Sequence, residues 1–351
     1  MKKIFVRPIV ASVVALVAMN AYADGASVYA LIDGGMASSR ISGGKSTTEF
    51  VTGGVAPTFA GVKFEKSAEG LTAGVQLEQG FLLNKIDGRT SAFGYDYSDK
   101  TEVLNRQKNI YVKGSVGTFV FGMQPNIAFN TLFVGDPRGG SNYGSALQSV
   151  NTEGGLNTID NGAVSYVSPA MAGVTLGVQH LPQSSDTGYK TGTRVTATYT
   201  NGKLTAAAAT YGSAYVDATK KDDTGTVLAA NYNFGKFTLK GLLVSQKTNT
   251  YTSALKTQGV GGAYVLNGKT TLDGGVYTAK SDTGNYKVNT TAFGAYYKLM
   301  KDLTLYGQYA VSDNKGSATA HWNFMWKTVE GETFTAGQKA SVLSAGLLYN
   351  F

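Results

Sequence analysis

The stretch TTAFGAYYKLMKDLTLYGQYAVS, residues 290–312, decides the fold class of this chain. On both sides of Lys301-Asp302, residues with odd numbers are mainly apolar or aromatic, whereas residues with even numbers include Thr, Gly, Gln and Lys. Alternation with a period of two is typical of a β-strand with two different faces. A two-residue break between two such runs joins antiparallel neighbours. The stretch therefore predicts a β-hairpin.

The same unit repeats along the second half of the chain. Short turns fall near residues 202, 235, 268 and 301, about 33 residues apart. The first contains Asn201-Gly202, a pair typical of tight hairpin turns because both residues tolerate positive φ. Longer polar stretches separate the hairpins, at 182–192, 213–225, 247–258 and 281–287. Short turns that alternate with long loops predict a barrel with tight turns at one rim and loops at the other.

The first half of the chain continues the pattern. The runs at 28–37, 60–66 and 106–114 predict further strands, with a long loop at about 38–56 between the first two. The whole chain then contains sixteen strands, seven short turns and eight long loops. An even number lets an up-and-down barrel close with both chain ends at one rim. We predict an all-β fold, a 16-stranded antiparallel transmembrane β-barrel.

Composition favours a membrane barrel over a soluble β-sandwich, which would show the same alternation. Only 15% of the residues are charged, against about 25% in typical soluble domains. The chain has 21 Tyr and 45 Gly, and tyrosine suits the aromatic girdles of membrane barrels. The sequence contains no run of about 20 apolar residues after the N-terminus, so it does not predict transmembrane helices.

The N-terminus has the three parts of a secretory signal peptide. Residues 1–8 carry Lys2, Lys3 and Arg7, residues 9–19 are an apolar run, and Ala21-Tyr22-Ala23 resembles a cleavage site. The apolar run is short for a membrane span, although a retained N-terminal anchor is the alternative. We expect a signal peptide over residues 1–23 and a single outer-membrane β-barrel domain over residues 24–351.

The sequence offers little chemistry for catalysis or cofactor binding. Cysteine is absent, and His180 and His321 are the two histidines. So few ligands make a zinc or haem site improbable, and no nucleophile-elbow, zinc-protease or phosphate-loop motif occurs. We expect no enzyme activity, no cofactor and no metal. A serine–histidine dyad in the barrel wall stays open as an alternative.

The connection at 125–161 differs from the other loops because it is long and apolar in its first third. Long irregular segments are usually functional. We expect this third long loop to fold inward and narrow the lumen. Its charged residues Asp136, Arg138, Glu153 and Asp160 are then candidates to face the pore. The alternative is an outward loop that packs on a neighbouring subunit.

Two cations of the predicted wall are further candidates for ion selectivity. If Val62 and Phe64 face lipid, Lys63 faces the lumen. Arg106 has the outward parity but lies at a loop end, where a long side chain can bend toward the mouth. Cations on a water-filled wall favour the entry of anions, and opposed carboxylates set up a transverse field.

Several segments together resemble the Gram-negative general porins, close to the neisserial and β-proteobacterial group. The resemblance covers the whole mature chain and rests on GASVYALIDGG (25–35), AGVKFEKSAEGLTAGVQLEQGF (60–81), RQKNIYVKGSVGTFVFGMQ (106–124), AVSYVSPAMAGVTLGV (163–178) and the terminal Phe351. It implies a homotrimer with an inward third loop and passive diffusion of small hydrophilic solutes. Relatives commonly carry an arginine where this chain has Phe59, so an arginine ladder is incomplete here.

We therefore expect an outer-membrane porin that passes ions and small hydrophilic solutes, with a mild preference for anions. The alternatives are a substrate-specific channel, in which Phe129, Phe133 and Tyr143 form a binding track, and a barrel enzyme or adhesin. The resemblance further implies contact with outer-membrane lipids and lipopolysaccharide. It also implies that Phe351 is a recognition signal for the barrel-assembly machinery. We expect no nucleic-acid partner.

Overall fold

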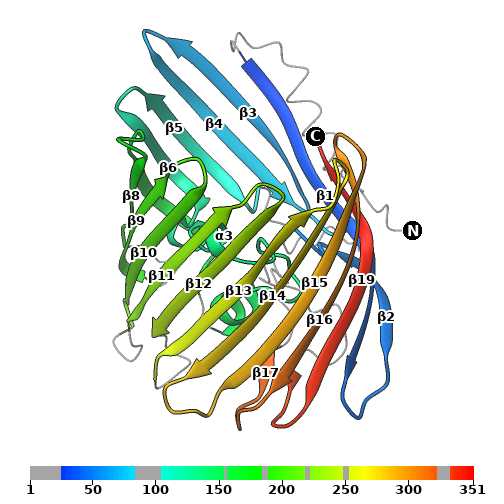
Figure 1. The fold of residues 1–351 in the computed structure, drawn as a ribbon. Helices are drawn as coiled ribbons and strands as arrows, with labels where there is room; N and C mark the ends of the chain where they lie inside the picture. Colours follow the sequence, from blue (N-terminus) through cyan, green and yellow to red (C-terminus); the bar gives the residue numbers. More distant parts are fainter. Residues whose placement is uncertain are drawn as a thin grey trace, which may run out of the picture.

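The structure, a computed structural model, describes residues 25–83, 104–153, 156–183, 189–217, 222–247, 253–321 and 333–351. Most of these residues form one antiparallel sheet that closes on itself (Figure 1). The expected signal peptide, residues 1–23, lies outside the described residues.

The strands of the wall follow one another in chain order around the barrel. They are β1 (Gly25–Ile41), β2 (Thr47–Thr52), β3 (Phe59–Ala68), β4 (Leu71–Gly80), β5 (Gln107–Gly114), β6 (Gly117–Pro125), β7 (Ile159–Val167), β8 (Val174–Leu181), β9 (Tyr189–Thr200), β10 (Leu204–Tyr215), β11 (Asp223–Asn233), β12 (Phe237–Lys247), β13 (Leu255–Val265), β14 (Thr270–Ser281), β15 (Lys287–Met300), β16 (Leu303–Asn314) and β19 (Lys339–Asn350).

The predicted sixteen-stranded barrel is confirmed, although the sheet contains seventeen separate strands. Both β2 and β3 pair with β1, β2 with its later half and β3 with its earlier half. They therefore occupy one position in the wall, interrupted at residues 53–58. The ring closes where β1 pairs with β19.

The first connection differs from the expected long loop at about 38–56. Strand β1 continues to Ile41, and β2 starts at Thr47, so the turn covers only residues 42–46. The segment is rich in Ser, Gly and Thr, residues that are common in loops but also fit a strand end near the aqueous rim. The predicted short turns at 202 and 235 are confirmed, and Gly202 and Gly235 have φ of 82° and 98°.

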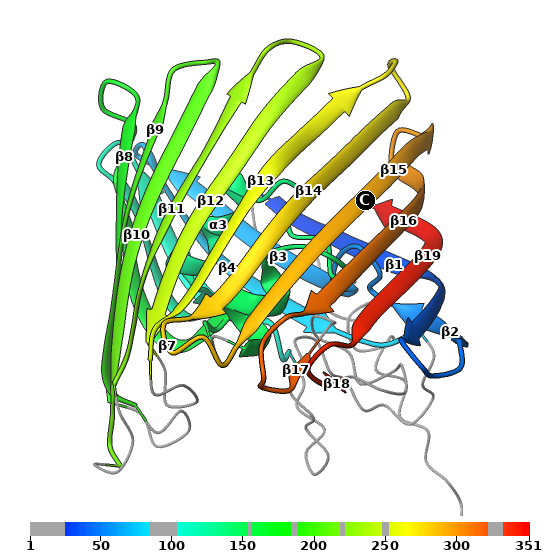
Figure 2. The same ribbon diagram turned by 60° about the horizontal axis from the view of Figure 1, so that its bottom comes forward.

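The two faces of the wall meet different surroundings. Residues of one parity are exposed on the outside of the ring, and many are large and apolar, such as Val260, Val276 and Phe293. Exposed aromatic side chains gather where strands meet the short turns: Tyr199, Tyr232, Phe234, Phe237, Tyr264, Tyr297, Tyr349 and Phe351. This pattern is typical of a lipid-facing band with an interfacial girdle. The small ribbon of β17 (Ala320–His321) and β18 (Thr333–Phe334), part of the connection between β16 and β19, lies at the opposite rim (Figure 2).

The helical segments of the described ranges belong to the connection between β6 and β7. They are α2 (Ile127–Asn130), α3 (Leu132–Gly135) and the π-helical η1 (Gln148–Glu153). Figure 1 shows α3 inside the ring of strands, where it contacts β10, β11 and β12. None of the helices in the described ranges is long and apolar enough to cross a membrane. The expected inward fold of the third long loop is confirmed.

Candidate pore constriction

The third loop, residues 126–158, holds its shape through a buried apolar side. Phe129, Leu132 and Val150 pack in one cluster with inward-facing wall residues such as Val227 and Leu242. Leu132 has no exposed surface. Burial of apolar area stabilises this contact by about 25 cal/mol per Å². The apolar first third of the loop, unusual in an exposed segment, is explained by its packing on the inner wall.

Asp136 organises the turn that follows α3. Its Oδ1 accepts hydrogen bonds from the Tyr277 hydroxyl at 2.7 Å and from the Arg138 amide at 2.9 Å. Its Oδ2 accepts one from the Ala146 amide at 3.0 Å. The side chain is fully buried. Burial raises the pKa of Asp136, and the Tyr277 hydrogen bond opposes that rise. Asp136 therefore ties two parts of the loop to β14.

Arg138 anchors the tip of the loop to the wall. Its Nη1 lies 2.6 Å from Oδ1 of Asp273 on β14, and its Nη2 donates to Oε1 of Gln308 on β16 at 2.5 Å. The Arg138 side chain has no exposed surface. A buried charge needs such a partner, because an unpaired ion in a low-dielectric site is costly.

The interruption at residues 53–58 forms the other support of the loop. Asp33 of β1 accepts hydrogen bonds from the amides of Val55 and Ala56 at 2.7 and 2.8 Å, which holds this segment in place. Asn142 of the third loop then donates to the Gly53 carbonyl at 2.5 Å, and its own amide donates to the Val55 carbonyl at 3.2 Å. Residues 53–58 thus hold the third loop through two hydrogen bonds on the side of β1.

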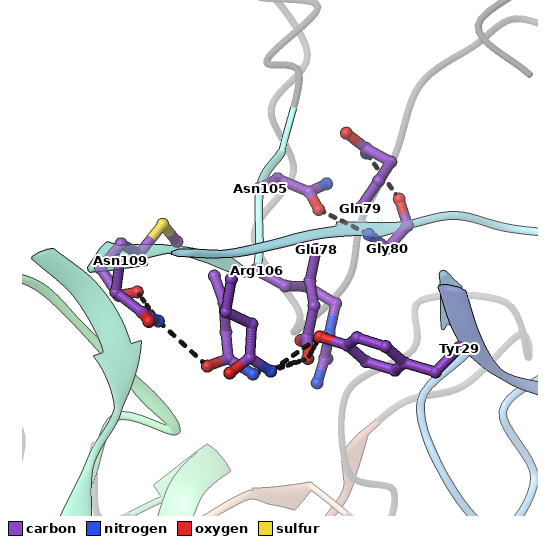
Figure 3. Close-up of polar contacts among 10 residues, drawn as sticks. Tyr29, Glu78, Gln79, Gly80, Asn105, Arg106 and Asn109 are labelled. Atoms are coloured by element: carbon purple, nitrogen blue, oxygen red, sulfur yellow. Dashed lines mark hydrogen bonds and ion pairs between the residues drawn. The ribbon is translucent and has the colours of Figure 1, made fainter. Parts of the chain in front are cut away.

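A first charged group on the inner wall centres on Glu78 of β4. Its Oε1 accepts hydrogen bonds from Tyr29 at 2.8 Å and Gln107 at 2.6 Å, and its Oε2 lies 3.2 Å from Nε of Arg106 (Figure 3). The Arg106 guanidinium also lies 4.2 Å from the ring centroid of Phe59. Arg106 thus reaches residues of the inner face, despite the outward parity of its position.

A second charged group lies on β3, closer to the short turns. Lys63 Nζ is 2.9 Å from Oε1 of Glu65 and 5.3 Å from the ring centroid of Tyr111. Tyr111 donates a hydrogen bond to Glu65 at 2.6 Å. The Lys63 and Glu65 side chains are 34% and 37% exposed. They are therefore accessible to solutes in the lumen, unlike Asp136 and Arg138.

Comparison with protein-family models matches residues 10–317 to the model described as Gram-negative porin. The chain belongs to the Gram-negative porin family. It is a non-enzymatic channel of the outer membrane, as the sequence predicts. A comparison with curated protein sequences finds no significant match.

Solved porin structures share the fold at low sequence identity. The anion-selective porin from Comamonas acidovorans is 19% identical, with a TM-score of 0.78 over 93% of this chain and 99% of that one. Salmonella typhi OmpF in complex with daunomycin is 15% identical, with a TM-score of 0.65 over 93% and 97%. OmpT of Vibrio cholerae is 16% identical, with a TM-score of 0.61 over the same shares.

The candidate charges of the porin fall into two groups. Lys63 is accessible from the lumen, and Arg106 reaches its inner face. Asp136 and Arg138 are buried between loop and wall. Asp160 is also buried, at the start of β7, and lies 3.2 Å from Arg194 of β9. Glu153 ends η1, and its side chain is outside the described residues.

Lys240 of β12 is a lumen cation that sequence reasoning did not select. It has the inward parity, is half-buried, and a Cβ on Gly139 of the third loop would lie 3.9 Å from its Nζ. Its parity in FTLKGLLVSQ indicates that it faces inward. Its closeness to the loop depends on which wall strands the loop covers, and the sequence does not contain that information locally.

The aromatic residues of the loop do not form a continuous surface in this porin. Phe129 and Tyr143 are 4% and 1% exposed, and Phe133 alone of the three is substantially accessible, at 39%. Phe129 and Phe133 pack edge to face, with ring centroids 5.5 Å apart. An aromatic binding track would need several accessible rings in a row, so the burial of two of the three disfavours a substrate-specific channel.

Proposed function

We propose that this porin is a general diffusion channel with a weak preference for anions, narrowed between the third loop and strands β3 to β5. The loop packs on the inner side of β8 to β12 and reaches β14 and β16 through Asp136 and Arg138. The opposite wall carries the Glu78 and Lys63 groups. Solutes would then pass between the third loop, whose apolar side packs on β8 to β12, and a wall with accessible charges.

The pairing of charges is the observation that carries this proposal. Lys63, Arg106, Arg138 and Arg194 each lie within 4 Å of a carboxylate: Glu65, Glu78, Asp273 and Asp160 respectively. Paired charges largely cancel one another's field at a distance. Lys240 and the inward-facing Lys113 form no ion pair with residues that the structure describes. Asp33 and Asp136, which also form no ion pair with described residues, are fully buried, so the accessible charge left unpaired is cationic. This excess favours anions weakly, as in the anion-selective Comamonas porin that shares the fold.

We also infer that the porin is a homotrimer with an N-terminal signal peptide over residues 1–23. A trimer form of Vibrio cholerae OmpT shares the fold, with a TM-score of 0.61 and 14% identity. Phe351 remains the proposed recognition signal for the barrel-assembly machinery. The basic, apolar and small-residue parts of the N-terminus support export.

A planar-bilayer recording in a tenfold KCl gradient tests selectivity and assembly together. We expect a reversal potential of anion sign that is well below the roughly 59 mV of a perfectly selective channel. Voltage-induced closure should occur in three equal steps, because three equivalent pores conduct in parallel. A reversal potential of zero or of cation sign would contradict the proposed preference for anions. A reversal potential close to that of a perfectly selective channel would contradict a weak preference. A single closing step would contradict the trimer.

A further inference from the structure

Two tyrosines of the inner wall reach across a glycine on the neighbouring strand to a glutamate on the strand beyond. Tyr29 of β1 is directly opposite Gly61 of β3, which is directly opposite Glu78 of β4. The Tyr29 hydroxyl donates to Oε1 of Glu78 at 2.8 Å (Figure 3). Neighbouring strands are about 4.8 Å apart, so the backbones of the tyrosine and the glutamate are about 10 Å apart. We refer to these three residues as the Tyr29 brace.

The same arrangement recurs in the opposite direction, from β5 to β3. Tyr111 is directly opposite Gly74 of β4, which is directly opposite Glu65. The Tyr111 hydroxyl donates to Oε1 of Glu65 at 2.6 Å, a length typical of a hydrogen bond to an ionised acceptor. We refer to these three residues as the Tyr111 brace. Glu65 and Glu78 are therefore each held by a tyrosine two strands away.

The glycine in the middle of each brace leaves the space that the tyrosine ring occupies. A Cβ added to Gly74 would overlap with the Tyr111 ring, and one added to Gly61 would overlap with the Tyr29 ring. Neither glycine has a positive φ, so the backbone alone would accept another residue. A glycine inside a strand often marks such a close approach of another group. The two glycines therefore let each ring lie across the neighbouring strand.

Each brace holds its glutamate next to a cation. Oε2 of Glu78 lies 3.2 Å from Nε of Arg106, and Oε1 of Glu65 lies 2.9 Å from Nζ of Lys63. The Lys63 ammonium also lies 5.3 Å from the centroid of the Tyr111 ring, within the range of cation–π attraction. Opposite charges that lie this close largely cancel one another's field at a distance. A tyrosine that keeps a glutamate beside its cation therefore weakens the negative field in the lumen.

We propose that Tyr29 and Tyr111 are positioning residues for ion selectivity, a role that rests on the proposed weak preference for anions. Each tyrosine keeps a wall carboxylate against its cation and away from the path of the solute. Without the hydroxyl, the glutamate is free to turn into the water-filled lumen, where an accessible carboxylate favours cations. Two residues that carry no charge thereby contribute to the sign of the selectivity.

The Tyr111 brace has the greater effect of the two. Its glutamate, Glu65, has a side chain that is 37% exposed. Glu78 is buried and also accepts hydrogen bonds from Gln76 at 3.1 Å and from Gln107 at 2.6 Å. These donors hold the Glu78 carboxylate in place when the Tyr29 hydroxyl is removed.

The variant Tyr111→Phe tests the proposal, because it removes the hydroxyl and keeps the ring. The measurement is the ratio of anion to cation permeability, from planar-bilayer recordings of the full-length porin in a KCl gradient. We expect this ratio to fall by about twofold at low ionic strength, where the field of an accessible carboxylate is least screened. Tyr29→Phe should lower the ratio by a smaller factor.

The matched control is Tyr166→Phe on the outer face. Tyr166 shares the parity of Val164, which is exposed to the outside. Its ring lies over Gly117, and its hydroxyl donates to the Val116 carbonyl at 2.6 Å. The control therefore loses the same hydroxyl without releasing a carboxylate, and it should leave the permeability ratio unchanged.

Two further variants separate positioning from a merely structural role. In a Glu65→Gln porin, Tyr111 has no carboxylate to hold, so the addition of Tyr111→Phe should leave the permeability ratio of that variant unchanged. Gly74→Ala keeps the hydroxyl but pushes the ring from its place, and it should lower the ratio as Tyr111→Phe does. An unchanged ratio in Tyr111→Phe, or an equal fall in the Glu65→Gln background, would overturn the proposal.

The native porin and the variants test different statements. The sign of the reversal potential of the native porin tests the proposed preference for anions. The change in permeability ratio between the native porin and Tyr111→Phe tests the brace. A native porin that prefers cations would contradict the proposed function, whereas a Tyr111→Phe variant with the native ratio would contradict the positioning role alone.

Discussion

Lys63 and Glu65 show that a charge contributes little to stability or to the distant field when a partner of opposite charge lies beside it. Their side chains are one third exposed and 2.9 Å apart, so the pair contributes little to stability. Its importance is for the field in the lumen, because removal of either partner leaves the other uncompensated. Glu78 is different, since it is buried and accepts several hydrogen bonds. Substitution of Glu78 would disturb the wall as well as the field.

Lys63→Glu should move the reversal potential toward cations. The substitution places two carboxylates at an accessible position and changes the local charge by two units. Screening by salt shortens the reach of this field to about 10 Å at 0.1 M, so the shift should be largest at low ionic strength. Salt-gradient recordings at a low ionic strength of about 0.01 M and at a high one of about 1 M measure the shift in reversal potential.

The matched control for this prediction is Lys66→Glu. Lys66 is exposed on the same strand but has the outward parity, so the same charge change should leave the reversal potential unaltered. Equal shifts of the reversal potential for the two variants would show that the recording is sensitive to charge on the outer surface rather than to charge in the lumen.

At the scale of elements, the third loop is fixed by contacts that span the lumen. Arg138 connects it to β14 and β16, Asp136 connects it to β14, and Asn142 connects it to the interruption between β2 and β3. The loop therefore depends on wall strands from both ends of the chain. We expect a loop held in this way to be rigid rather than a mobile lid.

Arg138→Gln should loosen the third loop, because it leaves the Asp273 carboxylate without its cation. Breaking a buried ion pair from one side costs about 3–5 kcal/mol. We expect lower thermal stability in detergent and greater noise in the open-channel current. The double variant Arg138→Gln/Asp273→Asn removes both charges and should recover at least half of the lost stability.

Lys315→Gln is the control for the anchor. It removes a cation from an exposed ion pair with Asp313, in which the lysine side chain is 52% exposed, and should cost under about 1 kcal/mol. An anchor variant no less stable than this control would mean that Arg138 does not hold the loop.

At the scale of the whole molecule, Phe351 extends the seam at which the barrel closes. The Phe351 amide donates to the Ala30 carbonyl at 3.1 Å, and the Ala30 amide donates to the Phe351 carbonyl at 3.0 Å. The ring is 53% exposed beside Tyr349, with ring centroids 5.5 Å apart. Phe351 therefore contributes both to the seam between β1 and β19 and to the aromatic girdle.

Deletion of Phe351 should reduce assembly into the membrane more than it changes conductance. The deletion removes two hydrogen bonds of the seam and one ring of the girdle, but no residue of the lumen. Surface labelling of cells measures the assembled amount, and bilayer recording measures the channels that do assemble. Phe351→Trp, which keeps an aromatic ring, is the control. Normal surface levels of the truncated porin would count against the proposed signal.

Much of the fold could be predicted because the pattern that specifies it is local. A strand has a side-chain period of two, so alternation in segments such as 303–312 indicates both the strand and its two faces. The same parity predicts that Lys63 lies on the inner wall, and in the structure it lies beside Glu65 and Tyr111. The turn at 42–46 and the interruption at 53–58 were missed. Residues such as Ser, Gly and Thr fit a loop and a strand end equally well.

The sequence by itself therefore determined the barrel, its two faces and the inward position of an unusually apolar loop. Tertiary structure alone decided which charges meet. Arg138 and Asp273 are 135 residues apart, and Asp33 and Tyr306, which also share a hydrogen bond, are 273 apart. The alternation of apolar and polar residues indicates only which face of each strand meets lipid and which meets water. Contacts across the lumen depend on how the closed ring brings distant strands together, so burial of Asp136, Arg138 and Asp160 could be seen only in the folded barrel.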